Sequence, residues 1–116
     1  MAAGYQDLFL EQGTTFTTSI TLDDQNGASY NLNSFIVASQ MKKSYYSSNI
    51  VMTFNTIIAD ANNGVITLSA NSAMTANIDP GKYLYDVVVK ESSSGIVTRV
   101  LEGQVIVSPG VTLSLS

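Results

Sequence analysis

The chain has 116 residues, of which 45% are apolar and 12% are charged, and its formal net charge is −4. This length suits one domain with a single core, so we expect one domain over residues 1–116. The few basic residues include only one adjacent pair, Lys42 and Lys43, which excludes an electrostatic footprint for nucleic acid or an anionic membrane. The sequence contains no cysteine, no signal-peptide pattern and no apolar run long enough to cross a bilayer.

Apolar and polar residues alternate through the first half of the chain, as is typical of half-buried strands. The predicted strands of this half cover residues 16–22, 29–32, 35–41 and 50–58. In the first of them Phe16, Ile20 and Leu22 share one face. Residues 23–27, which read Asp-Asp-Gln-Asn-Gly, predict a turn, and the polar stretch 42–48 predicts a loop.

The second half begins with a predicted turn at residues 60–64, Asp-Ala-Asn-Asn-Gly, which makes the strands on either side of it a hairpin. The one predicted helix lies near residues 71–78, where Asn71 or Ser72 can cap it. A helix of one to two turns needs packing to be stable, so we expect it to cover one end of a larger structure.

Residues 82–90 are predicted to form a central strand, because both faces of this segment carry apolar residues in part. One of these faces holds Tyr83, Tyr85, Val87 and Val89. A further strand is expected over residues 96–107 with a bend at Gly103, followed by a last edge strand at 111–115. Such an edge can pair within or between subunits, which leaves a homo-oligomer open.

About seven strands at spacings near ten residues, with one short helix, predict an all-β fold: an immunoglobulin-like antiparallel β-sandwich. A closed barrel is the chief alternative, but no even run of simple hairpins supports it.

Enzymatic chemistry is disfavoured because the chain has neither histidine nor cysteine, the usual sources of a general base, a thiol nucleophile and zinc ligands. We predict no catalytic, cofactor-binding or metal-binding residue. One alternative is an acid pair formed by Asp86 and Glu102 on adjacent strands. A surface ion-pair arrangement of these two carboxylates with Arg99 or a lysine is favoured over it.

Several segments carry a family resemblance, in order along nearly the whole chain. They cover residues 12–16, 32–42, 64–68, 75–78, 80–86 and 95–112. The most specific are Pro-Gly-Lys-Tyr-Leu-Tyr-Asp at 80–86 and Leu-Glu-Gly at 101–103. Together they resemble a small β-sandwich family of tailed phages, best known from the N-terminal domains of baseplate upper proteins of lactococcal-type phages. The chain is also similar in style to short virion proteins of marine cyanophages.

The resemblance implies a non-enzymatic structural protein of a phage virion, assembled in the host cytoplasm, that docks onto other particle proteins of the capsid, neck, tail or baseplate. The baseplate relatives continue into further domains and this sequence does not, so an accessory or decoration role is expected as readily as a baseplate role. The alternative is a host-glycan-binding module that uses the loop of Tyr45 and Tyr46.

Two groups of residues are predicted to contact partners. The first is the segment 1–10, whose apolar side chains exceed what a seven-strand core requires, with the strand end near residues 111–115 as its alternative. The second is the loop with two adjacent tyrosines. The candidate partner-binding residues are Tyr5, Leu8, Phe9, Leu10, Tyr45 and Tyr46. Deletion of residues 2–10 is expected to leave a folded monomer that no longer joins the particle.

Overall fold

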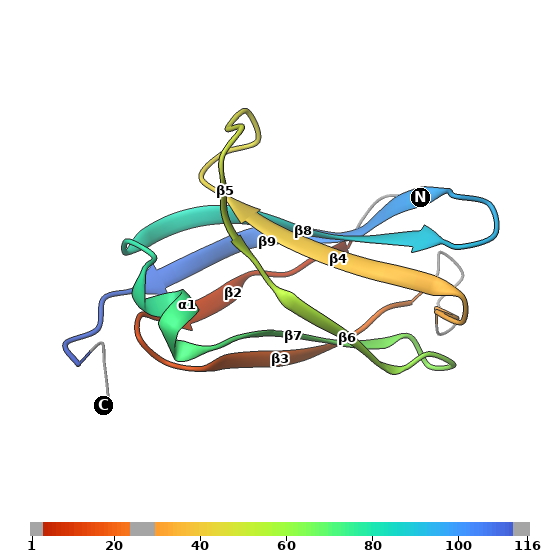
Figure 1. Cartoon of the computed structure of the whole chain (residues 1–116), viewed down its shortest axis with the longest axis horizontal. Coiled ribbons are helices and arrows are strands. Elements are labelled where there is room, and N and C mark those ends of the chain that lie inside the picture. The colour runs from red at the N-terminus through yellow and green to blue at the C-terminus, as the bar shows by residue number, and fades with distance from the viewer. Residues whose placement is uncertain (1–3, 24–29, 113–116) are drawn as a thin grey trace.

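A computed structural model of the chain describes residues 4–23 and 30–112, and it confirms the predicted all-β sandwich with one short helix. Two sheets pack face to face, with the helix at one end (Figure 1). The elements are β1 (Gly4–Tyr5), β2 (Leu8–Glu11), β3 (Phe16–Thr21), β4 (Phe35–Lys42), β5 (Ile50–Thr53), β6 (Asn55–Asp60), β7 (Val65–Ala70), α1 (Ser72–Ala76), β8 (Gly81–Glu91) and β9 (Val97–Ser108).

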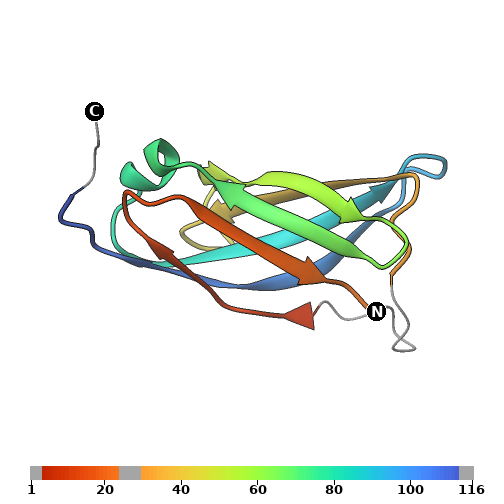
Figure 2. The same cartoon turned by 90° about the horizontal axis from the view of Figure 1, so that it is seen from below.

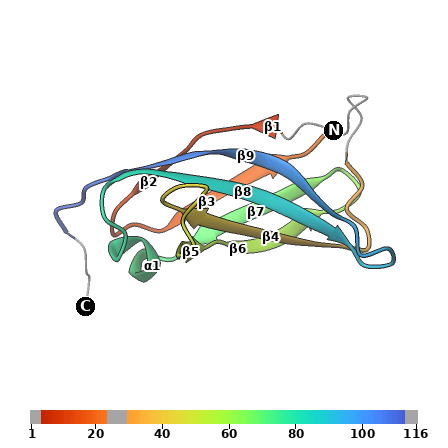
Figure 3. The same ribbon diagram turned by 90° about the horizontal axis from the view of Figure 1, so that it is seen from above.

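The larger sheet has the order β1-β9-β8-β4-β5, with β2 also paired to β9, and the smaller sheet has the order β3-β7-β6. The smaller sheet is seen from below in Figure 2 and the larger sheet from above in Figure 3. The chain passes from the larger to the smaller sheet between β5 and β6, where the Phe54 N–H donates to the Ser39 carbonyl at 3.0 Å. The predicted hairpin is confirmed as β6 and β7, which pair antiparallel.

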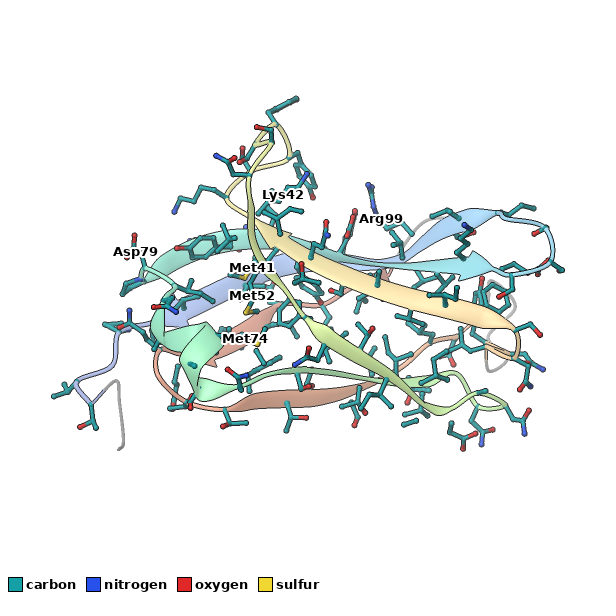
Figure 4. The ribbon with its side chains drawn as sticks, in the orientation of Figure 1. Met41, Lys42, Met52, Met74, Asp79 and Arg99 are labelled. Carbon is teal, nitrogen blue, oxygen red and sulfur yellow. The ribbon has the colours of Figure 1, made fainter. Side chains whose placement is uncertain are left out.

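The core lies between the two sheets and is built by the alternation that the sequence shows. In β8 the buried positions are Tyr83, Tyr85, Val87 and Val89, and the strand lies between β9 and β4, as a central strand should. Met41 and Met52 lie between the layers, and Met74 of α1 packs against the same cluster (Figure 4). Burying a side chain of this size stabilises the fold by about 1.5–3 kcal/mol.

The N-terminal segment differs from the predicted docking segment, because it forms two strands of the larger sheet, and both strands pair parallel with β9. β1 and β2 both run alongside β9, with Leu8 opposite Val105 and Leu10 opposite Val107. Leu8 is 3% exposed and Leu10 is 1% exposed. The prediction that these two leucines contact a partner is therefore wrong: the alternation of Leu8, Phe9 and Leu10 places both leucines in the core and Phe9 outside.

Gly103 has a different role from the predicted bend. A Cβ atom at Gly103 would lie 2.0 Å from the Gln6 carbonyl oxygen, so the glycine allows the backbone between β1 and β2 to approach β9. The register of β9 instead shifts near Val100, which is left without a partner between the positions opposite Val87 and Val88. This irregularity buries Val100 and Leu101 on successive positions.

The predicted helix cap is confirmed, but the short strands predicted at residues 29–32 and 111–115 are absent from the parts of these segments that the structure describes. Asn71 caps the helix, its Oδ1 accepting a hydrogen bond from the Met74 N–H at 2.8 Å. Residues 30–32 form no strand, and residues 111–112 do not continue into one. Residue 29, most of the turn at 23–27 and residues 113–115 lie outside the described residues. Within 4–23 and 30–112, no helix has the length and apolar character needed to cross a bilayer.

Candidate interaction surface

The two outer faces of the sandwich have different chemistry. On the smaller sheet the outward residues are largely hydroxyl or amide side chains, among them Thr17, Ser19, Thr21, Asn55, Thr67 and Ser69. On the larger sheet the outward positions alternate with the core residues of β4, β8 and β9 and include large apolar side chains. The exposed apolar residues on or beside this face are Tyr5, Phe9, Ile36, Tyr45, Ile50, Ile96 and Val97. The outer face of the larger sheet therefore carries more of the exposed apolar side chains that a partner protein could bury.

The basic residues of the chain gather on this same side. Lys42, Lys82, Lys90 and Arg99 occupy outward positions of β4, β8 and β9, and Figure 4 shows Lys42 and Arg99 directed away from the interlayer methionines. Lys43 follows β4, and its Nζ atom lies 4.7 Å from the centre of the Tyr83 ring and 3.4 Å from the Lys82 carbonyl oxygen. The strands of the smaller sheet carry no basic residue.

The centre of the face holds a small charge network. Asp86 and Glu102 lie directly opposite each other on β8 and β9. Arg99 Nε lies 3.1 Å from Asp86 Oδ2, and Arg99 Nη1 lies 3.6 Å from Glu102 Oε2. The two carboxylates are thus bound to one guanidinium, which is the surface ion-pair arrangement that the sequence favoured over an acid pair. Because the Arg99 side chain is half exposed, each ion pair contributes at most about 1 kcal/mol to stability.

An open hollow of ≈ 160 Å³ lies beside this network on the outer face. It is bounded by Gln40, Lys42, Ser44, Tyr45, Leu84, Tyr85, Asp86 and Arg99. The opposite charges of Asp86 and Arg99 compensate each other at its wall, and Lys42 leaves the polar lining with one positive charge. An arrangement of this kind can receive a neutral polar group or one side chain of a partner protein.

Three of the six predicted contact residues lie on or beside this face, although they are distant in sequence. Tyr5 lies on β1 opposite Glu102, Phe9 lies on β2 opposite Ile106, and Tyr45 borders the hollow. The pKa of Tyr5 is raised above its usual value, first by a hydrogen bond with Asp7 and also by the proximity of Tyr45 and Glu102.

Tyr46 is also outside the core but does not border the hollow: it is 97% exposed in the loop between β4 and β5. Figure 1 shows this loop projecting away from the outer face of the larger sheet. Sequence reasoning did not select Ile36 or Val97, which are exposed at the far end of the same face. For Ile36 the sequence carried a signal, because it occupies an outward position in a strand whose alternate residues Val37, Ser39 and Met41 are buried, whereas Val97 has no such alternation beside it.

The interior offers no polar group for a ligand. Tyr85 Oη donates to the Gln6 carbonyl at 2.6 Å, and burial raises the pKa of this phenol. Ser39 Oγ donates to the Asp86 carbonyl at 2.7 Å. In the part of the chain that the structure describes, every buried side-chain nitrogen and oxygen has a hydrogen-bond partner, and no three potential metal ligands come together. The outer face is therefore the site that the structure offers.

Comparison with known proteins gives a likeness of fold. No protein-family model and no curated protein sequence matches the chain. Among solved structures, the N-terminal domain of phage TP901-1 ORF48 superposes with a TM-score of 0.57 at 13% identity, over 92% of this chain and 98% of that one. Altogether 106 solved chains match, so the fold is widespread and its function has to be argued from the surface.

Proposed function

We propose that the chain is a non-enzymatic structural protein of a phage particle, which docks onto other virion proteins. The observation that carries this proposal is the fold likeness to a phage protein domain along nearly the full length of both chains. The surface chemistry supports it, since apolar and basic side chains gather on one face while the carboxylates of Asp86 and Glu102 are bound to Arg99. A contact module of this kind acts by surface complementarity alone.

The proposal is tested by the protein content of purified particles. Phage is produced from a host in which the chain carries a small epitope tag, and the particles are purified through two density gradients. Peptides of the chain are expected at a fixed copy number relative to the major structural proteins. A chain that is abundant in the lysate but lost from the particles at the second gradient contradicts a structural role.

The same preparation tests where the chain attaches. Labelling with antibody against the tag is expected to mark one region of the particle: capsid, neck, tail or baseplate. A decoration or accessory role predicts labelling distributed over a repeating surface, whereas a baseplate role predicts labelling at the tail tip only.

A glycan-binding module is the second candidate, and the hollow beside Tyr45 is the observation that favours it. Tyrosine presents a rigid aromatic surface with a polar tip, and Gln40, Asp86 and Arg99 supply hydrogen-bond acceptors and donors for sugar hydroxyls. The ligand class would be a saccharide that is neutral or carries one carboxylate, because Asp86 and Arg99 compensate each other and Lys42 leaves one positive charge at the wall. This function and docking through the same face compete with each other.

The variant Tyr45→Ala tests the glycan candidate. If the hollow binds a saccharide, loss of the aromatic wall is expected to weaken binding on a glycan array by about tenfold or more, equivalent to about 1.4 kcal/mol. Tyr46→Ala is the matched control, since Tyr46 is the next residue and lies outside the hollow. An array that stays blank for the unaltered protein, or an equal loss in both variants, eliminates the candidate.

A further inference from the structure

We infer that the outer face of the larger sheet is the docking surface and that its partner is an acidic protein surface that also presents apolar side chains to the two ends of the face. This inference rests on the proposed function and adds to it the face that is used and the chemistry of the partner. It follows from three properties of the face: the position of its basic residues, the position of its exposed apolar side chains, and the pairing of its two carboxylates with Arg99.

The distribution of charge is the first argument. The chain as a whole is acidic, with nine acidic and five basic residues, yet four of the basic residues lie on this face and the fifth lies at its end. Within the described residues, all ion pairs shorter than 4.0 Å involve Arg99. The lysines of the face are therefore not neutralised by a neighbour there, and they are free to meet carboxylates of another protein.

The acids of the face do not cancel this attraction. Asp86 and Glu102 are both bound to Arg99, so these three side chains together keep one negative charge at the centre of the face. Lys42, Lys82 and Lys90 stand around this centre on β4 and at the two ends of β8, and their positive charges outnumber it. A weakly acidic centre with basic residues around it matches an interface whose ionic contacts lie at the rim, where they steer association.

The second argument is the position of the exposed apolar side chains, which a partner can bury. Ile36 and Val97 are exposed at one end of the face, and Phe9 is exposed at the other end. Tyr45 and the hollow lie between them, so a partner side chain can insert at the middle of the contact. A standard interface buries about 800 Å² per partner, roughly an eighth of the 6792 Å² surface of this chain.

Other occupants of the face fit less well. A second copy packed symmetrically through this face would bring the lysines of one copy toward those of the other, which is unfavourable. Nucleic acid would place phosphates over the carboxylates of Asp86 and Glu102 at the centre of the face. An acidic protein surface avoids both conflicts, since its carboxylates meet the surrounding lysines and its apolar side chains meet Phe9 at one end of the face and Ile36 and Val97 at the other.

The test is rebinding of the purified chain to particles that lack it. Particles are produced with the gene deleted, and binding is measured by co-sedimentation at low and at high salt. The double variant Lys82→Gln/Lys90→Gln is expected to bind about tenfold more weakly than the unaltered chain at about 50 mM NaCl, with a smaller difference at about 500 mM, because salt screens the attraction. Lys82→Arg/Lys90→Arg, which keeps both charges, is expected to bind like the unaltered chain.

The matched control places the same change of net charge on the opposite face. Thr17→Glu/Thr21→Glu also lowers the net charge by two, but on exposed positions of β3 in the smaller sheet, and it is expected to bind normally. Equal weakening by both double variants, or none by either, overturns the inference about the face. Binding to free phage DNA with the same salt dependence, without binding to DNA-free particles, overturns the protein partner.

These outcomes separate the inference from the proposed function. If the unaltered chain joins particles but the lysine variant joins them equally well, the protein is structural and docks through another surface. If the unaltered chain is absent from particles, the structural role itself fails. A shift of the purified chain to dimers at micromolar concentration that Lys82→Gln/Lys90→Gln strengthens would show that the face pairs with a second copy, and it would overturn the acidic partner.

Discussion

Leu10→Ala is expected to lower the free energy of unfolding by about 2–5 kcal/mol, because it removes a fully buried side chain from the core and leaves a cavity. Small domains are stable by only about 5–15 kcal/mol, so this one change removes a large share of the total. The measurement is unfolding in urea or guanidinium, followed by circular dichroism. Leu10 belongs to a strand that sequence reasoning assigned to partner contacts, which makes the variant a direct test of the correction.

Phe9→Ala is the matched control, since it alters the neighbouring residue of the same strand on the opposite face. Phe9 is 69% exposed, and its truncation is expected to change stability by less than about 1 kcal/mol. Equal effects of the two variants would contradict the placement of β2 in the sheet. The same placement changes the expected result of deleting residues 2–10: the product is expected to be unfolded or aggregated rather than a folded monomer.

Gly103→Ala is expected to cost about 3 kcal/mol or more, because the added Cβ atom collides with the Gln6 backbone rather than with the end of a flexible side chain. The Cβ would lie 2.0 Å from the Gln6 carbonyl oxygen and 2.8 Å from the Gln6 carbonyl carbon. To relieve the collision, the segment joining β1 and β2 has to move away from β9. That movement weakens the hydrogen bonds from the Gln6 N–H to Glu102 and from Tyr85 Oη to Gln6.

Chemical denaturation measures this loss, and a change in the near-ultraviolet signal of the tyrosines, Tyr85 among them, accompanies movement of the segment. Gly4→Ala is the control on the same pair of strands. A Cβ atom at Gly4 would meet Leu101 Cδ1 at 3.4 Å, an ordinary contact, so its effect is expected to stay within about 0.5 kcal/mol. A Gly103→Ala protein as stable as the Gly4→Ala protein would show that the two backbones do not approach each other this closely.

The fold class was predictable because one periodicity dominates the sequence. In β4 and β8 every second side chain is buried, as the alternation from Phe35 to Met41 and from Tyr83 to Val89 predicts. The turn at 60–64 and the cap at Asn71 were predictable for local reasons, since a few neighbouring residues determine them. None of these features depends on which strands become neighbours.

The N-terminal strands were mispredicted because their partner is at the other end of the sequence. Local alternation in Leu8, Phe9 and Leu10 fits an exposed docking segment as well as a strand, and only the pairing with β9 decides between them. The same reason limited prediction of the interaction surface. Tyr5 and Tyr45 could be selected singly, but their common face with Arg99 arises from the order of strands in the sheet.

The parallel pairing of the first strands with the last one has a consequence for how the chain folds. The Gln104 N–H donates a hydrogen bond to Asp7 Oδ1, which lies 97 positions earlier, so β1 and β2 cannot pair until the much later strand β9 has been synthesised. Contacts this distant in sequence make folding slow, whereas the hairpin of β6 and β7 can form as soon as it is synthesised. Until β9 emerges, Leu8 and Leu10 remain accessible to chaperones and to neighbouring nascent chains.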